Sequence, residues 1–200
     1  MIVGAFSEKV RTFIAIFPPD SVKSALQTAQ AHLGNLVAPD AIRLTRIEQI
    51  HLTLQFLGPV ERERLSILKS AIQTIANDHT AFRLTVESLG CFPSLKRPRV
   101  LWAGLAGELA LLKTLKVELD AALSVFSYEP EKREFHPHFT IGRVAHLKQK
   151  ESQRLGKEIS KLDSTSFGEC NVQEIHLMQS VLSREGATYR TLKSFPLKTT

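Results

Sequence analysis

The sequence contains few of the residues that build disulfide, metal or membrane proteins. It has 2 cysteines, Cys91 and Cys170, and no Cys-x-x-Cys pair, so neither a disulfide framework nor a zinc or redox motif is expected. We therefore expect two unpaired thiols in a reducing compartment. No apolar run approaches the roughly 20 residues of a membrane span. Residues 1–6 lack a preceding basic segment and end at polar residues, which excludes a signal peptide and predicts a cytoplasmic protein.

The charge balance is moderately basic. The chain has 26 Lys and Arg against 20 Asp and Glu, a net charge of +6, which favours an anionic partner without separating RNA, nucleotides and acidic proteins. Hydrophobic residues make up 43% and charged residues 23% of the chain, which excludes disordered, collagen-like and coiled-coil classes. A chain of this length buries roughly 70% of its surface in one compact unit. We expect a single bilobal domain over residues 1–200.

Hydrophobic periodicity predicts strands and helices in irregular alternation. The expected strands cover residues 11–17, 42–45, 50–57, 82–86, 99–103, 138–144, 167–170, 173–183 and 187–195. The expected helices cover residues 20–36, 61–76, 108–126 and 149–162. Gly58 and Pro59 predict a turn, Gly90, Pro93 and Pro98 a loop, and the last two strands a hairpin. This order predicts an α+β fold with antiparallel sheet.

One strand-like pattern, His-x-Thr followed by apolar residues and Gly, occurs twice. It appears at His51 and Thr53 and again, 87 residues later, at His138 and Thr140. Residues two apart in a strand share a face, so each histidine is expected beside its threonine, with Gln55 on the face of the first pair. The apolar residues of the opposite faces are Leu52, Leu54, Phe56, Phe139 and Ile141. The repeat predicts two similar lobes whose His and Thr pairs line one cleft.

Paired histidines and threonines suit phosphoryl chemistry without a metal. The ordinary imidazole pKa near 6.5 allows one ring to be neutral and the other protonated near neutral pH, as acid–base catalysis requires. Threonine hydroxyls donate to the nonbridging oxygens of a phosphate. A single histidine on a strand is more often structural, whereas two in the same pattern favour catalysis.

The segments His51-Leu-Thr-Leu-Gln-Phe-Leu-Gly58 and His136-Pro-His-Phe-Thr-Ile-Gly-Arg143 resemble the two signature motifs of the 2H phosphoesterase superfamily. Within it, the chain is most similar to the RNA 2′,3′-cyclic phosphodiesterases, formerly described as 2′-5′ RNA ligases. The resemblance extends to residues 11–16, 97–104 and 180–186, with Tyr189, and so spans nearly the whole chain.

The resemblance implies two pseudo-symmetric lobes, with antiparallel sheets lining a central cleft and helices packed outside. It implies hydrolysis of a 2′,3′-cyclic phosphate, on an RNA end or a small cyclic nucleotide, to a 2′-phosphate. His51 would protonate the leaving 3′ oxygen, His138 would activate water, and Thr53 and Thr140 would hold the phosphate, although the sequence alone allows the two histidines to exchange roles. No metal, cofactor or membrane is implied, and we expect a monomer.

Two other functions remain open at this point. The same site performs 2′-5′ RNA end joining if it runs a related transesterification in reverse. Alternatively, the chain is an RNA-binding module without catalysis, although binding alone needs no imidazoles.

The residues beside the motifs leave further alternatives. His136 has the two-residue spacing from His138 that some metal pairs show, but no third ligand completes a set nearby, so a loop role is preferred. Arg143 is a candidate phosphate-binding residue, although strict alternation places it opposite His138 unless the strand twists after Gly142.

Aromatic and basic residues farther along the chain are also candidates for RNA contacts. Phe13 and Trp102 either stack on a base or belong to the core, and the core is the more common place for an aromatic in a central strand. Arg97 and Arg99 either guide an RNA backbone or lie in a solvated loop.

Overall fold

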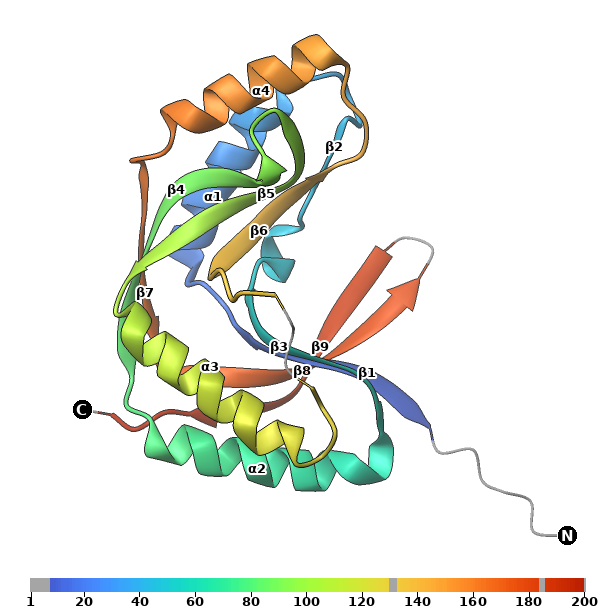
Figure 1. The fold of residues 1–200 in the computed structure, drawn as a ribbon, viewed down its shortest axis with the longest axis vertical. Coiled ribbons are helices and arrows are strands. Elements are labelled where there is room, and N and C mark those ends of the chain that lie inside the picture. The colour runs from blue at the N-terminus through green and yellow to red at the C-terminus, as the bar shows by residue number, and fades with distance from the viewer. Residues whose placement is uncertain (1–7, 130–132, 184–185, 200) are drawn as a thin grey trace, which may run out of the picture.

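The structure, a computed structural model, describes residues 8–129, 133–183 and 186–199. Over these residues the chain forms nine strands and four α-helices arranged in two lobes (Figure 1). The strands are β1 (Lys9–Ile16), β2 (Ile42–Leu44), β3 (Leu52–Glu61), β4 (Phe82–Ser94), β5 (Arg97–Gly107), β6 (His138–Val144), β7 (Ser166–Val172), β8 (Glu174–Ser183) and β9 (Gly186–Pro196). The helices are α1 (Asp20–Gly34), α2 (Leu65–Asp78), α3 (Leu109–Ser124) and α4 (Gln149–Lys161), with short 3-10 turns η1 (Ile47–Gln49) and η2 (Arg62–Arg64).

Each lobe is built on one antiparallel sheet. The first sheet has the strand order β3-β1-β8-β9, and the second has the order β2-β6-β5-β4-β7. Helices α2 and α3 pack outside the first sheet, and α1 and α4 pack against the second. The two His-x-Thr strands therefore belong to different sheets, β3 to the first and β6 to the second. The predicted α+β architecture with two lobes is confirmed.

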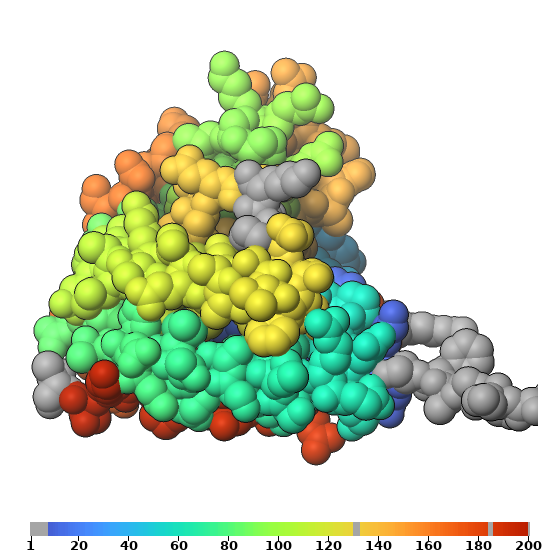
Figure 2. All heavy atoms as spheres, turned by 60° about the horizontal axis from the view of Figure 1, so that its bottom comes forward, coloured from blue at the N-terminus to red at the C-terminus, as the bar shows by residue number. Residues whose placement is uncertain are grey.

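The outer helices form because their apolar residues recur every three or four positions. In α3 the buried leucines are Leu112, Leu115, Leu119 and Leu123, which gives one continuous stripe toward the sheet. Helix α2 repeats this pattern, and Figure 2 shows the two helices side by side on the outside of their lobe. No described helix has the length and apolar character needed to cross a bilayer.

The two sheets share one continuous hydrophobic core that includes the inner faces of both. A second, small cluster lies on the opposite face of the first sheet. It consists of the buried residues Phe13, Ala15 and Met178, against which Phe17 and Tyr189 pack. This small cluster matters for function because it supports the face that carries the first His-x-Thr pair.

The predicted turn at Gly58 and Pro59 is wrong, because β3 continues through both residues to Glu61. Gly58 has a φ of 71° and pairs with Thr12 of β1. The following β1 residue, Phe13, pairs with Phe56, so the register shifts by one residue at this point. Glycine adopts this backbone conformation without strain. Pro59 is tolerated because β3 is an edge strand, where a missing N–H leaves no neighbour without a partner.

The predicted loop around Gly90, Pro93 and Pro98 is also wrong, because these residues belong to the long β4–β5 hairpin. The two prolines face each other across the ladder, beyond the residues that pair with β7 and β6, so neither needs to donate to a further strand. Gly90 is required by packing, since an added Cβ would lie 2.1 Å from the ring of Trp102.

The remaining sequence predictions need only small changes. The helix expected from residue 61 begins at Leu65, after the turn η2. The hairpin of β8 and β9 is confirmed. Cys91 and Cys170 are unpaired, as expected, and both are buried. Burial raises the pKa of the Cys170 thiol to about 11.

Candidate active site

Both His-x-Thr strands break their alternation at the same place, directly after the threonine. In β3, Leu54 and Gln55 are both buried, and the register against β1 shifts there. In β6, Ile141 and Gly142 are both buried, and the register against β5 shifts there. Each shift is a β-bulge. The residue after the two buried ones, Phe56 in β3 and Arg143 in β6, therefore lies on the same face as the histidine.

The bulge in β3 overturns the expectation that Gln55 shares a face with His51. Gln55 is 4% exposed, and its side-chain amide donates to the carbonyl of Tyr128 at 3.3 Å. Phe56, expected in the core, is 48% exposed instead, with the guanidinium of Arg11 lying 4.6 Å from the centre of its ring.

The bulge in β6 brings Arg143 to the face of His138, where strict alternation did not place it. Arg143 is exposed, whereas the two residues before it are buried. Its charge is one of the causes that lower the pKa of His138, so the two side chains lie within electrostatic reach. Across the ladder Arg143 lies directly opposite Arg43, a second arginine that sequence analysis did not single out.

A buried glutamine from α1 holds the β6 bulge in place. The side-chain amide of Gln30 donates to the carbonyls of Ile141 and Thr45, each at 2.7 Å, and Gln30 is only 4% exposed. The backbone N–H of Thr45 also donates to the Ile141 carbonyl at 3.0 Å. Because Gln30 lies 111 residues from Ile141, no local sequence pattern could indicate this contact.

Replacing Gln30 with leucine is expected to destabilise the fold by about 1–3 kcal/mol, because the partly buried Thr45 carbonyl loses a donor. The KM for a phosphate substrate is expected to rise as well, since Arg143 follows the bulge. Urea unfolding and steady-state kinetics measure the two effects, and Gln27→Leu on the exposed side of the same helix is the control. Equal stabilities of the two variants would contradict the role given to Gln30.

His51 is held by its backbone and by aromatic rings. Its Nδ1 lies 2.6 Å from the carbonyl oxygen of Gln49. A carbonyl only accepts, so Nδ1 carries the hydrogen and Nε2 is the nitrogen left for chemistry. The imidazole packs against Phe13, Tyr189 and Phe17, with ring centres 4.9, 5.3 and 5.7 Å away. Phe13 is 3% exposed, so it supports His51 and does not present a face to a base.

His138 repeats this arrangement in the other lobe. Its Nδ1 lies 2.6 Å from the carbonyl oxygen of His136, again two residues earlier. Its ring packs against Phe92 at 5.2 Å and Trp102 at 6.3 Å between ring centres. The imidazole of His136 itself faces Glu134 at 3.7 Å, so this loop residue contributes its carbonyl to the site. Among the described residues, no three His, Cys, Asp or Glu side chains gather as a metal site.

Burial and neighbouring charges lower the pKa of both histidines. Burial is the main cause that lowers the pKa of His51, the Gln49 carbonyl opposes it, and the charge of His138 lowers it further. Burial likewise lowers the pKa of His138; the His136 carbonyl opposes this, and the charges of His136 and Arg143 add to the lowering. The charge of His138, in the second sheet, thus acts on the imidazole of His51, which precedes β3 of the first sheet.

The two threonines lie on the faces that carry the histidines. Thr53 is exposed and pairs with Ala15 of β1, and Thr140 is half-buried and pairs with Trp102 of β5. We call His51, Thr53, His138, Thr140 and Arg143 the two-histidine site. The other basic candidates, Arg97 and Arg99, are exposed at the start of β5, next to the turn of the β4–β5 hairpin.

The chain is similar to known proteins over most of its length. The family model described as LigT-like phosphoesterase matches residues 16–102 and 106–189. An RNA 2′,3′-cyclic phosphodiesterase of Methanocaldococcus jannaschii is 31% identical over 186 residues, covering 93% of this chain and 100% of the relative. A protein of the same description from Aeropyrum pernix is 31% identical over 164 residues, covering 81% of this chain and 91% of the relative.

Solved structures show the same fold. The structure of Escherichia coli LigT complexed with 3′-AMP has a TM-score of 0.75 and 26% identity, covering 96% of this chain and 99% of that one. A Thermus thermophilus structure has a TM-score of 0.76 and 27% identity, covering 94% and 98% of the two chains. Since the family model spans both histidine motifs and most of the sequence, the chain belongs to the LigT-like phosphoesterase family.

Proposed function

We propose that the protein hydrolyses the 2′,3′-cyclic phosphate of RNA ends and small nucleotides to a 2′-phosphate, with His51 and His138 as the acid and base. The observation that carries this proposal is the repeated geometry of the two histidines. Each donates from Nδ1 to a carbonyl two residues earlier, and each precedes a threonine on the same face. The names of the relatives, RNA 2′,3′-cyclic phosphodiesterases, support the substrate class.

The reaction needs one proton removed and one supplied. A water molecule attacks the phosphorus while Nε2 of His138 accepts its proton. The bond from phosphorus to the 3′ oxygen breaks, and Nε2 of His51 donates a proton to that oxygen. The phosphate remains on the 2′ oxygen, and exchange with solvent returns both rings to their starting states.

Arg143 supports this division of roles. A neighbouring cation disfavours protonation, and Arg143 acts in this sense on the pKa of His138. A neutral His138 is the state that accepts a proton from water. His51 then gains its proton when the phosphate anion enters, because a nearby negative charge favours the imidazolium.

The threonine hydroxyls and Arg143 stabilise the pentacoordinate transition state. Thr53 and Thr140 donate to nonbridging oxygens from opposite lobes, and the Arg143 guanidinium supplies positive charge. These groups provide the proton transfers and charge that the reaction requires, so the proposal includes no metal. We place this reaction in the cytoplasm, where the two unpaired thiols remain reduced.

The pH dependence of kcat/KM is expected to be bell-shaped, with its maximum below about pH 6.5, the ordinary imidazole pKa. Both histidine pKa values are lowered, so each ring loses its proton at a lower pH than a free imidazole. Activity falls at higher pH as the acid loses its proton and at lower pH as the base gains one. Initial rates on a 2′,3′-cyclic mononucleotide measure the profile, and a flat profile between about pH 5 and 8 would contradict it.

The proposed function is tested directly by incubating the protein with an RNA oligonucleotide that ends in a 2′,3′-cyclic phosphate. The expected result is a terminal phosphomonoester, formed at the same rate with and without EDTA. Loss of activity in EDTA would contradict the metal-free mechanism. Accumulation of a joined RNA in place of the monoester would favour the 2′-5′ joining reaction.

A further inference from the structure

A pocket of about 490 Å³ lies beside the two-histidine site, a volume within the usual range for small-molecule sites. It is formed where the first sheet meets the end of β7 and the turn η1. Its walls include Phe17, Glu48, Glu174, His176, Met178 and Tyr189. The two proposed proton transfers and the phosphate contacts do not use this pocket.

Two aromatic residues line the pocket and also contact the first histidine, His51. The rings of Phe17 and Tyr189 both line the pocket and both contact the ring of His51. Phe17 stands between His51 and His176, with ring centres 5.7 and 5.3 Å away. A ligand group that enters the pocket therefore contacts two rings that also pack against the imidazole of His51.

The sheet register places the pocket on the face that carries Thr53. Ala15 of β1 pairs with Thr53 on one side and with His176 of β8 on the other, and directly paired residues point to the same face. The pocket is thus a lateral continuation of the site across the first sheet. It extends from the side of His51 and not from the side of His138.

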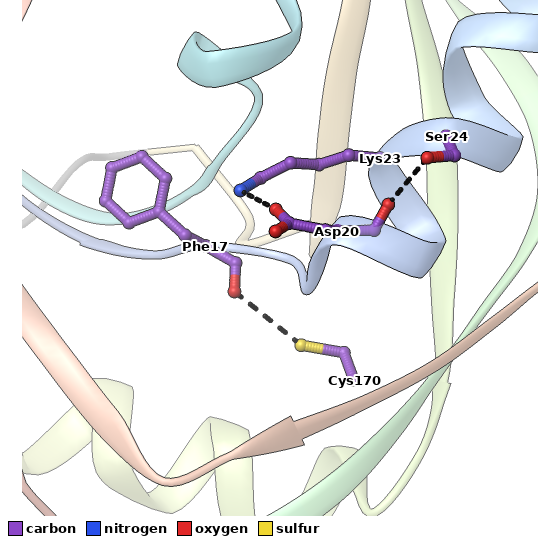
Figure 3. Close-up of polar contacts among 5 residues, drawn as sticks. All are labelled: Phe17, Asp20, Lys23, Ser24 and Cys170. Carbon is purple, nitrogen blue, oxygen red and sulfur yellow. Dashed lines mark hydrogen bonds and ion pairs between the residues drawn. The ribbon is translucent and has the colours of Figure 1, made fainter.

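The backbone at Phe17 is held by a contact with Cys170 and by the start of helix α1. The Sγ of Cys170 lies 3.9 Å from the Phe17 carbonyl oxygen, and Figure 3 shows that the Phe17 ring extends away from this contact. Helix α1 begins three residues later, where Lys23 pairs with Asp20 at 2.9 Å. Phe17 is therefore a positioned aromatic surface at the pocket wall.

The carboxylates of the pocket disfavour a phosphate and favour a group that donates hydrogen bonds. Glu48 and Glu174 contribute carboxylates, and among its described lining residues there is no Lys or Arg. His176 donates or accepts at Ser194, 2.9 Å away, and faces Glu174 at 3.8 Å. Aromatic walls with carboxylate acceptors suit a nucleobase, which stacks by its face and donates N–H groups from its edge.

We propose that this pocket holds the base of the nucleotide that carries the cyclic phosphate, and that its carboxylates select guanine over uracil. The proposal rests on the proposed function, which places the leaving 3′ oxygen, and hence the ribose, next to His51. Guanine presents two adjacent N–H donors, at N1 and N2, that a carboxylate accepts together. Uracil presents a single N–H between two carbonyls, which Glu48 and Glu174 repel.

The test is an equilibrium binding measurement with the two reaction products, guanosine 2′-phosphate and uridine 2′-phosphate. The protein is expected to bind the guanosine compound roughly ten-fold more tightly or better. The double variant Glu48→Gln and Glu174→Gln is expected to bring the affinity ratio close to one. Asp163→Asn, which removes an exposed carboxylate after α4, is the charge-matched control and is expected to keep the ratio.

Hydrolysis of the four 2′,3′-cyclic mononucleotides gives a second measurement, in which kcat/KM is expected to be highest for guanosine. Equal affinity for the two products, or a ratio that the double variant leaves unchanged, overturns the base pocket while hydrolysis still stands. Selective binding without hydrolysis of any cyclic phosphate supports the base pocket and overturns the proposed function. A preference that appears only in dinucleotides assigns the selection to another nucleotide and also overturns the proposal.

Discussion

Replacing His138 or His51 with alanine is expected to lower kcat for cyclic phosphate hydrolysis by about 10²–10⁴-fold each, the usual contribution of a positioned acid or base. The loss is expected in kcat more than in KM, because the imidazoles transfer protons in the transition state. The double variant is expected to lose less than the product of the single losses, since either change already disables the paired transfer.

The folded state is expected to survive these changes. Both rings are only half-buried, and the carbonyls that hold them belong to the backbone, which the variants keep. Thermal unfolding and circular dichroism of each variant check this expectation. His146→Ala, an exposed histidine just after β6, is the matched control for kcat, and undiminished hydrolysis by both site variants would refute the assignment.

Replacing Thr53 or Thr140 with valine is expected to lower kcat by about 10²–10³-fold, the size of effect seen when one donor to a developing oxyanion is removed. Valine keeps the β-branched shape and removes only the hydroxyl, so the strands are expected to keep their register. Serine in place of threonine is expected to restore most of the activity.

The threonine prediction has its own control on the molecular surface. Thr114 is an exposed residue of α3 whose hydroxyl donates to the carbonyl of Ala110, and it is not part of the two-histidine site. Thr114→Val is expected to leave kcat unchanged. An equal loss of kcat in Thr114→Val and Thr140→Val would mean that the hydroxyls do not stabilise the phosphate. Unchanged kcat in both Thr53→Val and Thr140→Val would mean the same.

The fold was predictable where hydrophobic periodicity was uninterrupted. The leucine stripe of α3 and the strand β6 were both evident from the residues alone. The predictions were wrong at Pro59, Pro93 and Pro98, because a proline ends a strand only where a neighbouring strand needs its backbone N–H as a donor. That information lies in the sheet order, which a single strand does not contain.

The faces on which the histidines and threonines of the candidate site lie were predictable, but the placement of the residues around them was not. The repeated motif predicts which face His138 and Thr140 share, yet strict alternation misplaced Gln55, Phe56 and Arg143. The bulges that reorder them depend on tertiary contacts, such as the amide of Gln30 at the second bulge.

The pocket beside His51 could not be predicted for a related reason. Its walls come from β1 and the segment after it, η1, β7, β8 and β9, and no short segment carries more than a part of them. Glu48 and His176 have no motif of their own. The register of β1 with its two neighbours places His176 on the face that carries Thr53.

The chemical step itself provides the most direct test. An RNA that ends in a 2′,3′-cyclic phosphate is treated with the protein in water enriched in oxygen-18, and the product is analysed by mass spectrometry and resolved into its phosphate isomers. Attack by one water with departure of the 3′ oxygen predicts a 2′-phosphate that carries a single heavy oxygen. A 3′-phosphate, or a phosphate without the label, would contradict the account.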